Sequence, residues 1–256
     1  MKTAMHPHEA KRVTVEGYIN EFGKKLDGKG NERIRPSAKC PACGGDMHTK
    51  GEANPVVDGI FSHQPNRDQF CPLKESAEKP YVILPPVEED PVRSQSLRAS
   101  FLKNWKLHYA LIKKYVKVID IFDFIRLIEF ADRKKIWSYR HIEENQIPYI
   151  FLVLKEFPPV RNKKRYLRRD WLRFWFDSRV RDLEDLWIKT DGQWILLKAT
   201  YANPRNGNVP SHKQLKDTEL LDIDLEFLNG AEPNLHEFVI EKMHERFGED
   251  IDQSSA

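Results

Sequence analysis

Residues 40–71 read CPACGGDMHTKGEANPVVDGIFSHQPNRDQFC and contain all three cysteines of the 256-residue chain. The two-residue spacer lets the sulfurs of Cys40 and Cys43 reach one ion, and the glycines that follow supply the open backbone angles of a metal-binding turn. With His63 and Cys71 the spacing is C-x2-C-x19-H-x7-C, which provides four ligands for a tetrahedral site. We therefore predict a zinc ion bound by Cys40, Cys43, His63 and Cys71.

Two alternatives to this ligand set follow from the same stretch. His48 lies five positions after Cys43 and could replace His63 as the fourth ligand. We favour His63, because pairing it with Cys71 joins two separate chain segments through the metal. The three cysteines could instead be reduced, buried thiols that act as small hydrophobic residues. Four protein ligands leave no coordination position for water, so the predicted zinc is structural rather than catalytic.

The same run is similar to the N-terminal zinc ribbon of competence protein CoiA-like proteins, in which a CxxC knuckle precedes an aromatic-x-His element such as Phe61-Ser62-His63. The resemblance covers about residues 38–73. It implies a following nuclease domain, in which an Asp and an acid-x-Lys pair on adjacent strands hold Mg²⁺. Here the best-placed strand reads Trp194-Ile195-Leu196-Leu197-Lys198, with Leu196 where the acid is required. We therefore transfer no catalytic residue from that family.

Composition narrows the class of protein. Hydrophobic residues make up 40% and charged residues 32% of the chain, as expected of a globular protein with a highly charged surface. No run of about 18 apolar residues is present, so no membrane-spanning helix is expected. The N-terminus lacks the apolar segment of a secretory signal, and three cysteines are poor material for a disulfide framework. These features predict a cytoplasmic protein without a membrane association.

The positions of the prolines and the spacing of apolar residues divide the chain into four predicted parts. Together these parts predict an α+β fold. Residues 1–37 read as a short amphipathic element and a connection, residues 38–84 as the zinc ribbon, and residues 85–96, with prolines at 85, 86 and 91, as a link. Residues 97–256 are predicted to form a mainly helical domain with one β-hairpin.

Helical and strand signals recur within that last part. Apolar residues from Leu97 to Val116 recur every three or four positions, which predicts one helix, and Asp120 is a candidate N-cap for a second. The apolar run of residues 147–157 fits a buried strand or a buried helix equally well. Asp191-Gly192 predicts a hairpin between strands 185–190 and 193–201, and residues 235–247 predict an amphipathic helix.

Charge is segregated along the chain. Residues 161–181 contain nine basic and two acidic residues, whereas residues 217–256 contain twelve acidic and two basic residues. We predict that the basic block forms a helix whose cations contact successive phosphates and whose tryptophans stack on bases. The predicted contacts are Lys163, Lys164, Arg165, Arg168, Arg169, Arg173, Trp171 and Trp175.

The alternative is that the basic residues pair within the molecule with the acidic region near Glu237, Glu241 and Glu245, or that the acidic region docks a protein partner. No phosphate-binding glycine loop and no nucleophile elbow occurs. The sequence thus favours a non-catalytic, zinc-binding protein that associates with DNA or RNA. The alternatives are an interaction subunit of a larger assembly and a divergent Mg²⁺-dependent nuclease.

Overall fold

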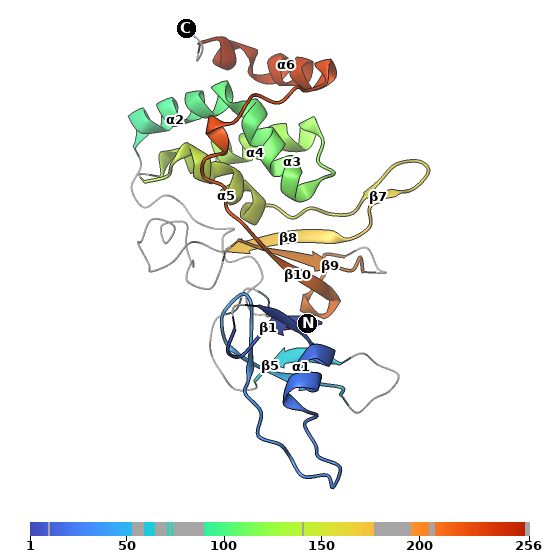
Figure 1. The fold of residues 1–256 in the computed structure, drawn as a ribbon. Coiled ribbons are helices and arrows are strands. Elements are labelled where there is room, and N and C mark those ends of the chain that lie inside the picture. Colours follow the sequence, from blue (N-terminus) through green and yellow to red (C-terminus); the bar gives the residue numbers. More distant parts are fainter. Residues whose placement is uncertain are drawn as a thin grey trace. The chain divides into compact units, whose positions relative to one another are not determined.

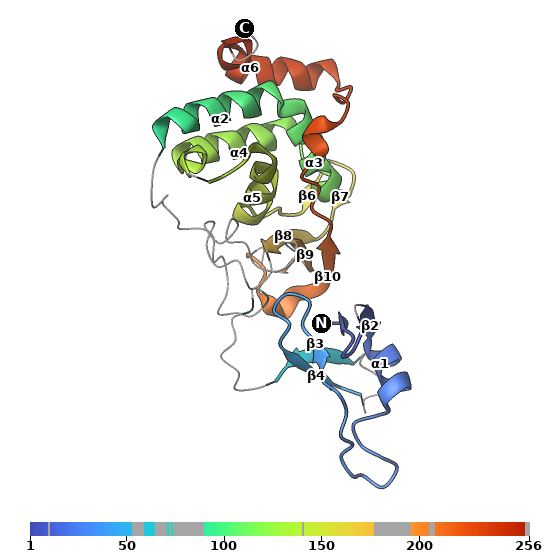
Figure 2. The same ribbon diagram turned by 60° about the vertical axis from the view of Figure 1, so that its left-hand side comes forward.

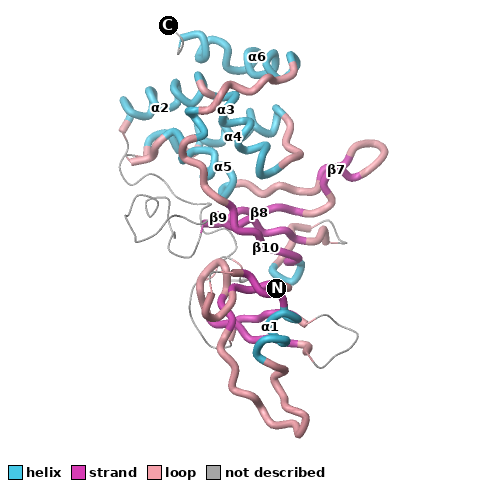
Figure 3. The backbone as a smooth tube through the Cα atoms, viewed as in Figure 1, coloured by secondary structure: helices cyan, strands magenta, loops and turns pink. Residues whose placement is uncertain are grey.

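A computed structural model of the chain describes residues 1–9, 11–52, 59–64, 71, 73, 90–139, 141–176, 196–204 and 208–253. Helices and antiparallel strands are both present, which confirms the α+β class (Figures 1 and 3). The chain separates into two compact units. Unit 1 comprises residues 1–79, 170–179 and 195–221, and unit 2 comprises residues 80–169, 180–194 and 222–256.

A five-stranded antiparallel sheet organises the N-terminal part of unit 1. Its strand order is β2-β1-β3-β4-β5, so the N-terminal residues join the sheet that contains the cysteine knuckle. The strands are β1 (Thr3–Met5), β2 (Arg12–Thr14), β3 (Ala38–Lys39), β4 (Asp46–Lys50) and β5 (Ile60–His63). Residues 1–37 were therefore predicted incompletely: the amphipathic element is present, but two strands of three residues are too short to give a period.

Helix α1 (Val15–Phe22) is the amphipathic element expected near the N-terminus. The Thr14 side chain accepts a hydrogen bond from the Gly17 amide at 3.0 Å, which satisfies one of the unpaired donors of the first turn. Val15 and Tyr18 are buried, and Gly23 ends the helix with a φ of +80°. Glycine adopts this backbone conformation without the steric cost that a side chain would add.

A three-stranded antiparallel sheet completes unit 1, and it corrects the predicted basic helix. Its order is β10-β9-β8, formed by β8 (Trp171–Phe176), β9 (Leu196–Tyr201) and β10 (Leu215–Leu221), and the short 3-10 helix η5 (His212–Gln214) precedes β10. Residues 172–176 are all buried. A strand buried on both faces has no polar alternation, so its aromatic residues also matched a helical spacing. Aromatic side chains favour strands, and pairing with β9 decides the conformation.

Strand β9 agrees with the second predicted strand, whereas residues 185–190 and Asp191-Gly192 lie outside the described residues. In β9, Leu196 is completely buried. The Lys198 ammonium forms an ion pair with Glu219 of β10 at 2.9 Å.

Unit 2 contains the helices. They are α2 (Pro91–Lys103), α3 (Trp105–Val116), α4 (Ile121–Arg133), α5 (Ile147–Leu154) and α6 (Glu237–Gln253), with 3-10 helices η2 (Ile136–Ser138), η3 (Glu144–Gln146) and η6 (Phe227–Asn229). Helix α6 packs on α2 and α4, as Figure 2 shows. The helix expected at residues 235–247 is thus present and extends to Gln253.

Several helix boundaries differ from the predicted ones for identifiable reasons. The single helix expected from Leu97 to Val116 is two helices that meet at Asn104. Residues 91–96, predicted as link, form the first turns of α2, because the Asp90 side chain caps the helix and Pro91 is compatible with its first turn. Asp120 caps α4 as predicted, and its side chain accepts a hydrogen bond from the Asp123 amide at 2.7 Å.

The first eight residues of the apolar run, Ile147–Leu154, form helix α5. A reciprocal capping arrangement between Glu143 and Gln146 starts the turn, and Pro148 lies at the beginning of the helix, where its missing amide costs nothing. Residues 147–153 are all buried, so the helix has no polar face from which a period could be recognised.

A buried polar cluster links three helical segments of unit 2. His108 is completely buried, and its Nε2 lies 2.9 Å from Oε1 of Glu144. Ser100 and Asn104 also donate hydrogen bonds to the Glu144 carboxylate. Burial lowers the pKa of His108, and the hydrogen bond to Glu144 acts in the opposite direction.

Candidate metal centre

The cysteine knuckle lies in the turn that joins β3 to β4. The Cys40 amide donates to the Gly45 carbonyl at 2.8 Å, and the Gly44 amide donates to the Cys40 carbonyl at 2.8 Å. Gly44 has a φ of +66°, which a glycine adopts readily. The Gly45 amide then points at the Cys43 sulfur, at 3.4 Å. The local fold thus orients both sulfurs and supplies a backbone donor to one of them.

His63 reaches the knuckle through strand pairing. It ends β5 and pairs with Met47 of β4, which places its ring beside the turn that β4 follows. Cys71 adds the remaining sulfur from a separate part of the chain and is 1% exposed. The four predicted ligands therefore converge from three segments, and their ligand atoms all lie within 4.8 Å of one another.

Distances within the cluster are those of neighbouring ligands rather than of bonded sulfurs. The Sγ atoms of Cys40 and Cys71 are 3.8 Å apart, far longer than the disulfide bond of about 2.05 Å. The Cys43 sulfur lies 3.4 Å from Nε2 of His63. Cys40, Cys43, His63 and Cys71 lie together and could hold a metal ion.

Electrostatics within the cluster favour one thiolate over three. Hydrogen bonds from the other two thiols lower the pKa of Cys43, and the interaction with Cys43 raises the pKa of Cys40 to about 12. Hydrogen bonds with Cys40 and Cys43 raise the pKa of Cys71. A divalent cation among the sulfurs reverses this preference, because coordinated thiols are deprotonated.

His48, the competing fourth ligand, does not belong to the cluster. It pairs with Ser62 in the register of β4 and β5, one position away from the Met47–His63 pair. Successive side chains of a strand point to opposite faces of the sheet, so His48 and His63 are directed to different faces. The preference for His63 over His48 agrees with the geometry of the four-residue cluster.

The residues predicted to contact nucleic acid are divided among three environments, and none of them lies on a helix. Lys163, Lys164, Arg165 and Arg169 are exposed in and beside a two-stranded hairpin. This hairpin consists of β6 (Val160–Arg161) and β7 (Tyr166–Arg168) with the turn between them, and we refer to residues 160–169 as the basic hairpin (Figure 1).

Arg168 has a structural position in the basic hairpin. Its guanidinium donates hydrogen bonds to the carbonyl oxygens of Pro158 at 2.6 Å and Val118 at 2.8 Å, with a longer contact to Val116. These bonds hold β7 against the end of α3. Arg168 is thus an anchor of the hairpin and not one of its free cations.

The predicted contacts in β8 are largely inside the protein. Arg173 is 4% exposed and lies over the Tyr201 ring, 5.0 Å from its centroid, and Trp175 is 3% exposed. Trp171 is partly exposed and donates to the Asn203 side chain at 3.1 Å. The prediction that Arg173 and Trp175 contact nucleic acid is therefore wrong, because both contribute to the packing of the sheet.

Sequence reasoning missed a second group of metal-ligating residue types, formed by His6, Glu9 and Glu21. The His6 ring is already satisfied: Nδ1 accepts from the amides of His8 and Glu9, and Nε2 lies 3.0 Å from Glu21. Two exposed carboxylates and a ring in a fixed hydrogen-bonding arrangement fit a local structural role. No motif in the sequence marks this group.

None of the described helices is long and apolar enough to cross a membrane. Comparison with known proteins gives no match to any family, to any curated protein or to any solved structure.

Proposed function

We propose that the chain binds one structural Zn²⁺ through Cys40, Cys43, Cys71 and His63. Typical Zn–S and Zn–N bonds of about 2.3 and 2.05 Å imply edges of about 3.8 Å between sulfurs and about 3.6 Å between sulfur and nitrogen in a tetrahedral site. The observed 3.8 and 3.4 Å agree with these edges. Thiolate and imidazole ligands in a tetrahedral set favour zinc over Mg²⁺ or Ca²⁺.

The zinc that we propose organises the sheet of unit 1 and has no catalytic role. Its four protein ligands complete the coordination, so no position remains for a water or a substrate. It connects the β3–β4 turn, the end of β5 and Cys71 across the sheet. Short strands of two to five residues gain most of their stability from such a link.

We further propose that the protein associates with nucleic acid through the basic hairpin. The observation that carries this proposal is the charge of residues 161–169, which include six basic and no acidic residues. Apart from the anchor Arg168, the cations are exposed, and none of the ion pairs among the described residues involves them. Unpaired cations on a projecting segment are suited to phosphate contact. These cations are Arg161, Lys163, Lys164, Arg165 and Arg169.

The turn of the hairpin is well defined, which lowers the entropic cost of binding. The Asn162 side chain accepts hydrogen bonds from the amides of Lys164 at 3.0 Å and Arg165 at 2.7 Å. The backbone amide of Asn162 in turn donates to the backbone carbonyl of Arg165 at 3.0 Å. Exposed Tyr166 beside Arg161, whose guanidinium lies 5.3 Å from the ring centroid, offers a surface for base stacking.

Intramolecular pairing with the acidic C-terminal region has less support. Glu245 of α6 pairs with Lys242 of the same helix, Asp250 pairs with Arg98, and Arg246 of α6 pairs with Glu129. In the described part of unit 2, no ion pair joins α6 to the basic hairpin. The acidic region thus satisfies part of its charge with other partners, which leaves the hairpin cations available.

A salt titration tests the nucleic-acid proposal. Fluorescence anisotropy with labelled single-stranded DNA, duplex DNA and RNA of unrelated sequence gives the affinity between 50 and 200 mM salt. For duplex DNA, the slope of log K against log salt concentration is about −0.9 per phosphate contact. Three to five contacts therefore predict an affinity that falls about 40- to 500-fold over this range. Charge-neutralising substitution of Lys163, Lys164 and Arg165 by Gln should reduce the slope by about 2.7.

A matched control removes three other exposed cations of unit 2, by substitution of Lys103, Arg133 and Lys134 with Gln. The control should retain the wild-type slope. Equal affinities and slopes for the wild type and the hairpin variant would refute the proposal and favour a protein partner instead.

A further inference from the structure

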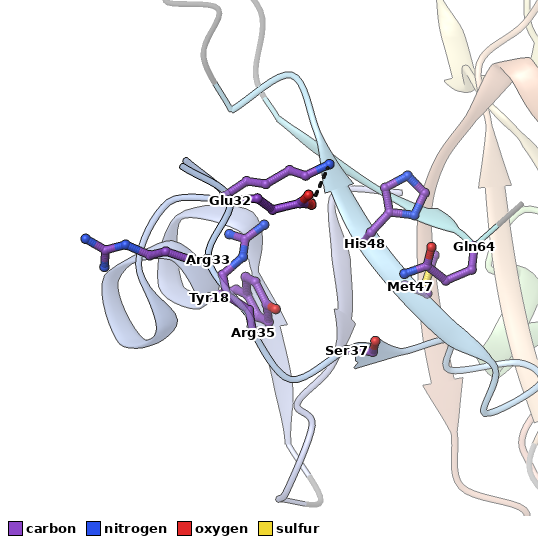
Figure 4. Close-up of a pocket in the computed structure, with 9 residues that line it drawn as sticks. Tyr18, Glu32, Arg33, Arg35, Ser37, Met47, His48 and Gln64 are labelled. Carbon is purple, nitrogen blue, oxygen red and sulfur yellow. Dashed lines mark ion pairs between the residues drawn. The ribbon is translucent and has the colours of Figure 1, made fainter. Parts of the chain in front are cut away.

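A pocket of about 310 Å³ lies in unit 1, apart from the metal ligands. Figure 4 shows its side chains, which come from α1, from the segment after it and from the β4 and β5 side of the sheet. Its volume is at the lower end of the range for small-molecule sites. The lining residues are Tyr18, Lys25, Glu32, Arg33, Arg35, Ser37, Met47, His48 and Gln64.

One wall of the pocket is rigid. The side chains of Arg35 and Glu52 are each 8% exposed and form an ion pair at 2.9 Å. Arg35 also donates to the Gly23 carbonyl at 2.9 Å and to the Thr49 hydroxyl at 3.0 Å. Its guanidinium lies 5.3 Å from the centroid of the Tyr18 ring. A network of this kind fixes the shape of the wall before any ligand arrives.

Four other polar side chains line the pocket with unused hydrogen-bonding capacity. Within the described residues, the side chains of Arg33, Ser37, His48 and Gln64 have no hydrogen-bond or ion-pair partner. The Nδ1 atom of His48 is buried without a partner. Native proteins satisfy most buried polar atoms, so the Nδ1 atom of His48 indicates a position that a ligand completes, whereas Arg33 is exposed to solvent.

The charges in the pocket select the class of ligand. Lys25, Arg33 and Arg35 supply three cations, and Glu32 is the one carboxylate among the lining residues, where it pairs with Lys25 at 3.3 Å. Arg33 therefore remains without a counter-ion among the described residues. In Figure 4 its guanidinium lies on the side of the view opposite His48 and Gln64. The pocket thus has a cationic end and a neutral hydrogen-bonding end, and its lining is more polar than apolar.

We propose that this pocket binds a small phosphomonoester, with the phosphate at Arg33 and Lys25 and the hydroxyl- or amide-bearing remainder at Ser37, His48 and Gln64. A guanidinium suits phosphate oxygens because its donors match their geometry. The neutral end can both donate and accept, as a sugar or a base edge requires. This inference is independent of the basic hairpin and goes beyond nucleic-acid association.

Calorimetric titration of the full zinc-loaded chain tests the proposal with three probes: inorganic phosphate, ribose 5-phosphate and adenosine 5′-monophosphate. Ribose 5-phosphate should bind more tightly than inorganic phosphate, because it reaches both ends of the pocket. Tighter binding of the nucleotide would identify a base subsite, and equal binding would identify a sugar phosphate. The hairpin variant with Lys163, Lys164 and Arg165 replaced by Gln should bind all three probes as the wild type does, so the two proposals fail separately.

Two variants and one control locate the binding. The Arg33→Gln variant should weaken all three probes about 10-fold or more, as expected for the loss of a charge-assisted hydrogen bond. The Gln64→Met variant should weaken the two esters and leave inorganic phosphate unchanged. Lys29→Gln removes the same charge from the exposed loop and should change affinity less than about 2-fold.

Metal content and far-ultraviolet circular dichroism establish that each variant is folded. Absence of binding to all three probes at millimolar concentration would overturn the proposal. An equal loss of affinity in Arg33→Gln and Lys29→Gln would also overturn it, because the attraction would then be general surface charge.

Discussion

Replacement of Arg168 by Gln separates the anchor of the basic hairpin from its free cations. The guanidinium makes two short hydrogen bonds, to the carbonyl oxygens of Pro158 at 2.6 Å and Val118 at 2.8 Å. A hydrogen bond from a charged group contributes about 1.5–3 kcal/mol. Because the side chain is only partly buried, we take the lower limit for each bond and expect a loss of about 3 kcal/mol.

The neighbouring residue supplies the control. Arg169 is exposed, so Arg169→Gln should change the free energy of unfolding by no more than about 0.5 kcal/mol. Urea unfolding followed by far-ultraviolet circular dichroism measures both values, and a loss of about 3 kcal/mol corresponds to roughly 6–12 °C in thermal midpoint. Equal stability of the two variants would refute the role of Arg168 as an anchor.

Three further predictions concern the rest of the molecule. Elemental analysis should find about one zinc per chain, and Cys43→Ser and His63→Ala should lose it while His48→Ala retains it; retention by His63→Ala would contradict the ligand set. Addition of Mg²⁺ or Mn²⁺ should not produce strand cleavage, and metal-dependent nicking that is lost in Lys198→Ala would restore the nuclease alternative. Burial lowers the pKa of His108 below its ordinary value of 6.5, so the unfolded chain binds the additional proton. Stability should therefore decline as the pH falls below about 6.5, by up to about 1.4 kcal/mol per pH unit, and His108→Gln should reduce this decline in urea titrations at pH 7.5 and 5.5.

The cluster of Cys40, Cys43, His63 and Cys71 was predictable because its chemistry is encoded in residue type and spacing. Few residue types bind zinc, and the CxxC spacing sets a local geometry that tertiary structure does not alter. The choice between His48 and His63 needed one further fact, the register of β4 and β5. Register depends on pairing between strands, and the turn signals Asn54-Pro55 and Asp58-Gly59 do not fix it across so long a connection.

In the basic block, residues 161–181, the spacing of the aromatic residues predicted the wrong secondary structure. Trp171, Phe174 and Trp175 match a helical stripe, yet the same residues form a strand that is buried on both faces. A run without polar alternation gives no period with which to separate the two states, and pairing with β9 decided between them. Burial of Arg173 was equally hidden, because the Tyr201 ring beneath it is 28 positions away in sequence.

A hairpin presents the cations differently from the helix that the sequence suggested. In the basic hairpin, Arg168 is partly buried and donates to the carbonyl oxygens of Pro158 and Val118, while Leu167 and Arg169 are exposed. One arginine of the basic hairpin, Arg168, therefore fixes its position, while Arg161, Arg165 and Arg169 are exposed. Because a fixed hairpin loses less conformational entropy on binding, the anchor should raise affinity without adding a phosphate contact. Loss of Arg168 should consequently weaken nucleic-acid binding by a similar factor at every salt concentration, whereas loss of Lys163, Lys164 and Arg165 should reduce the salt slope itself.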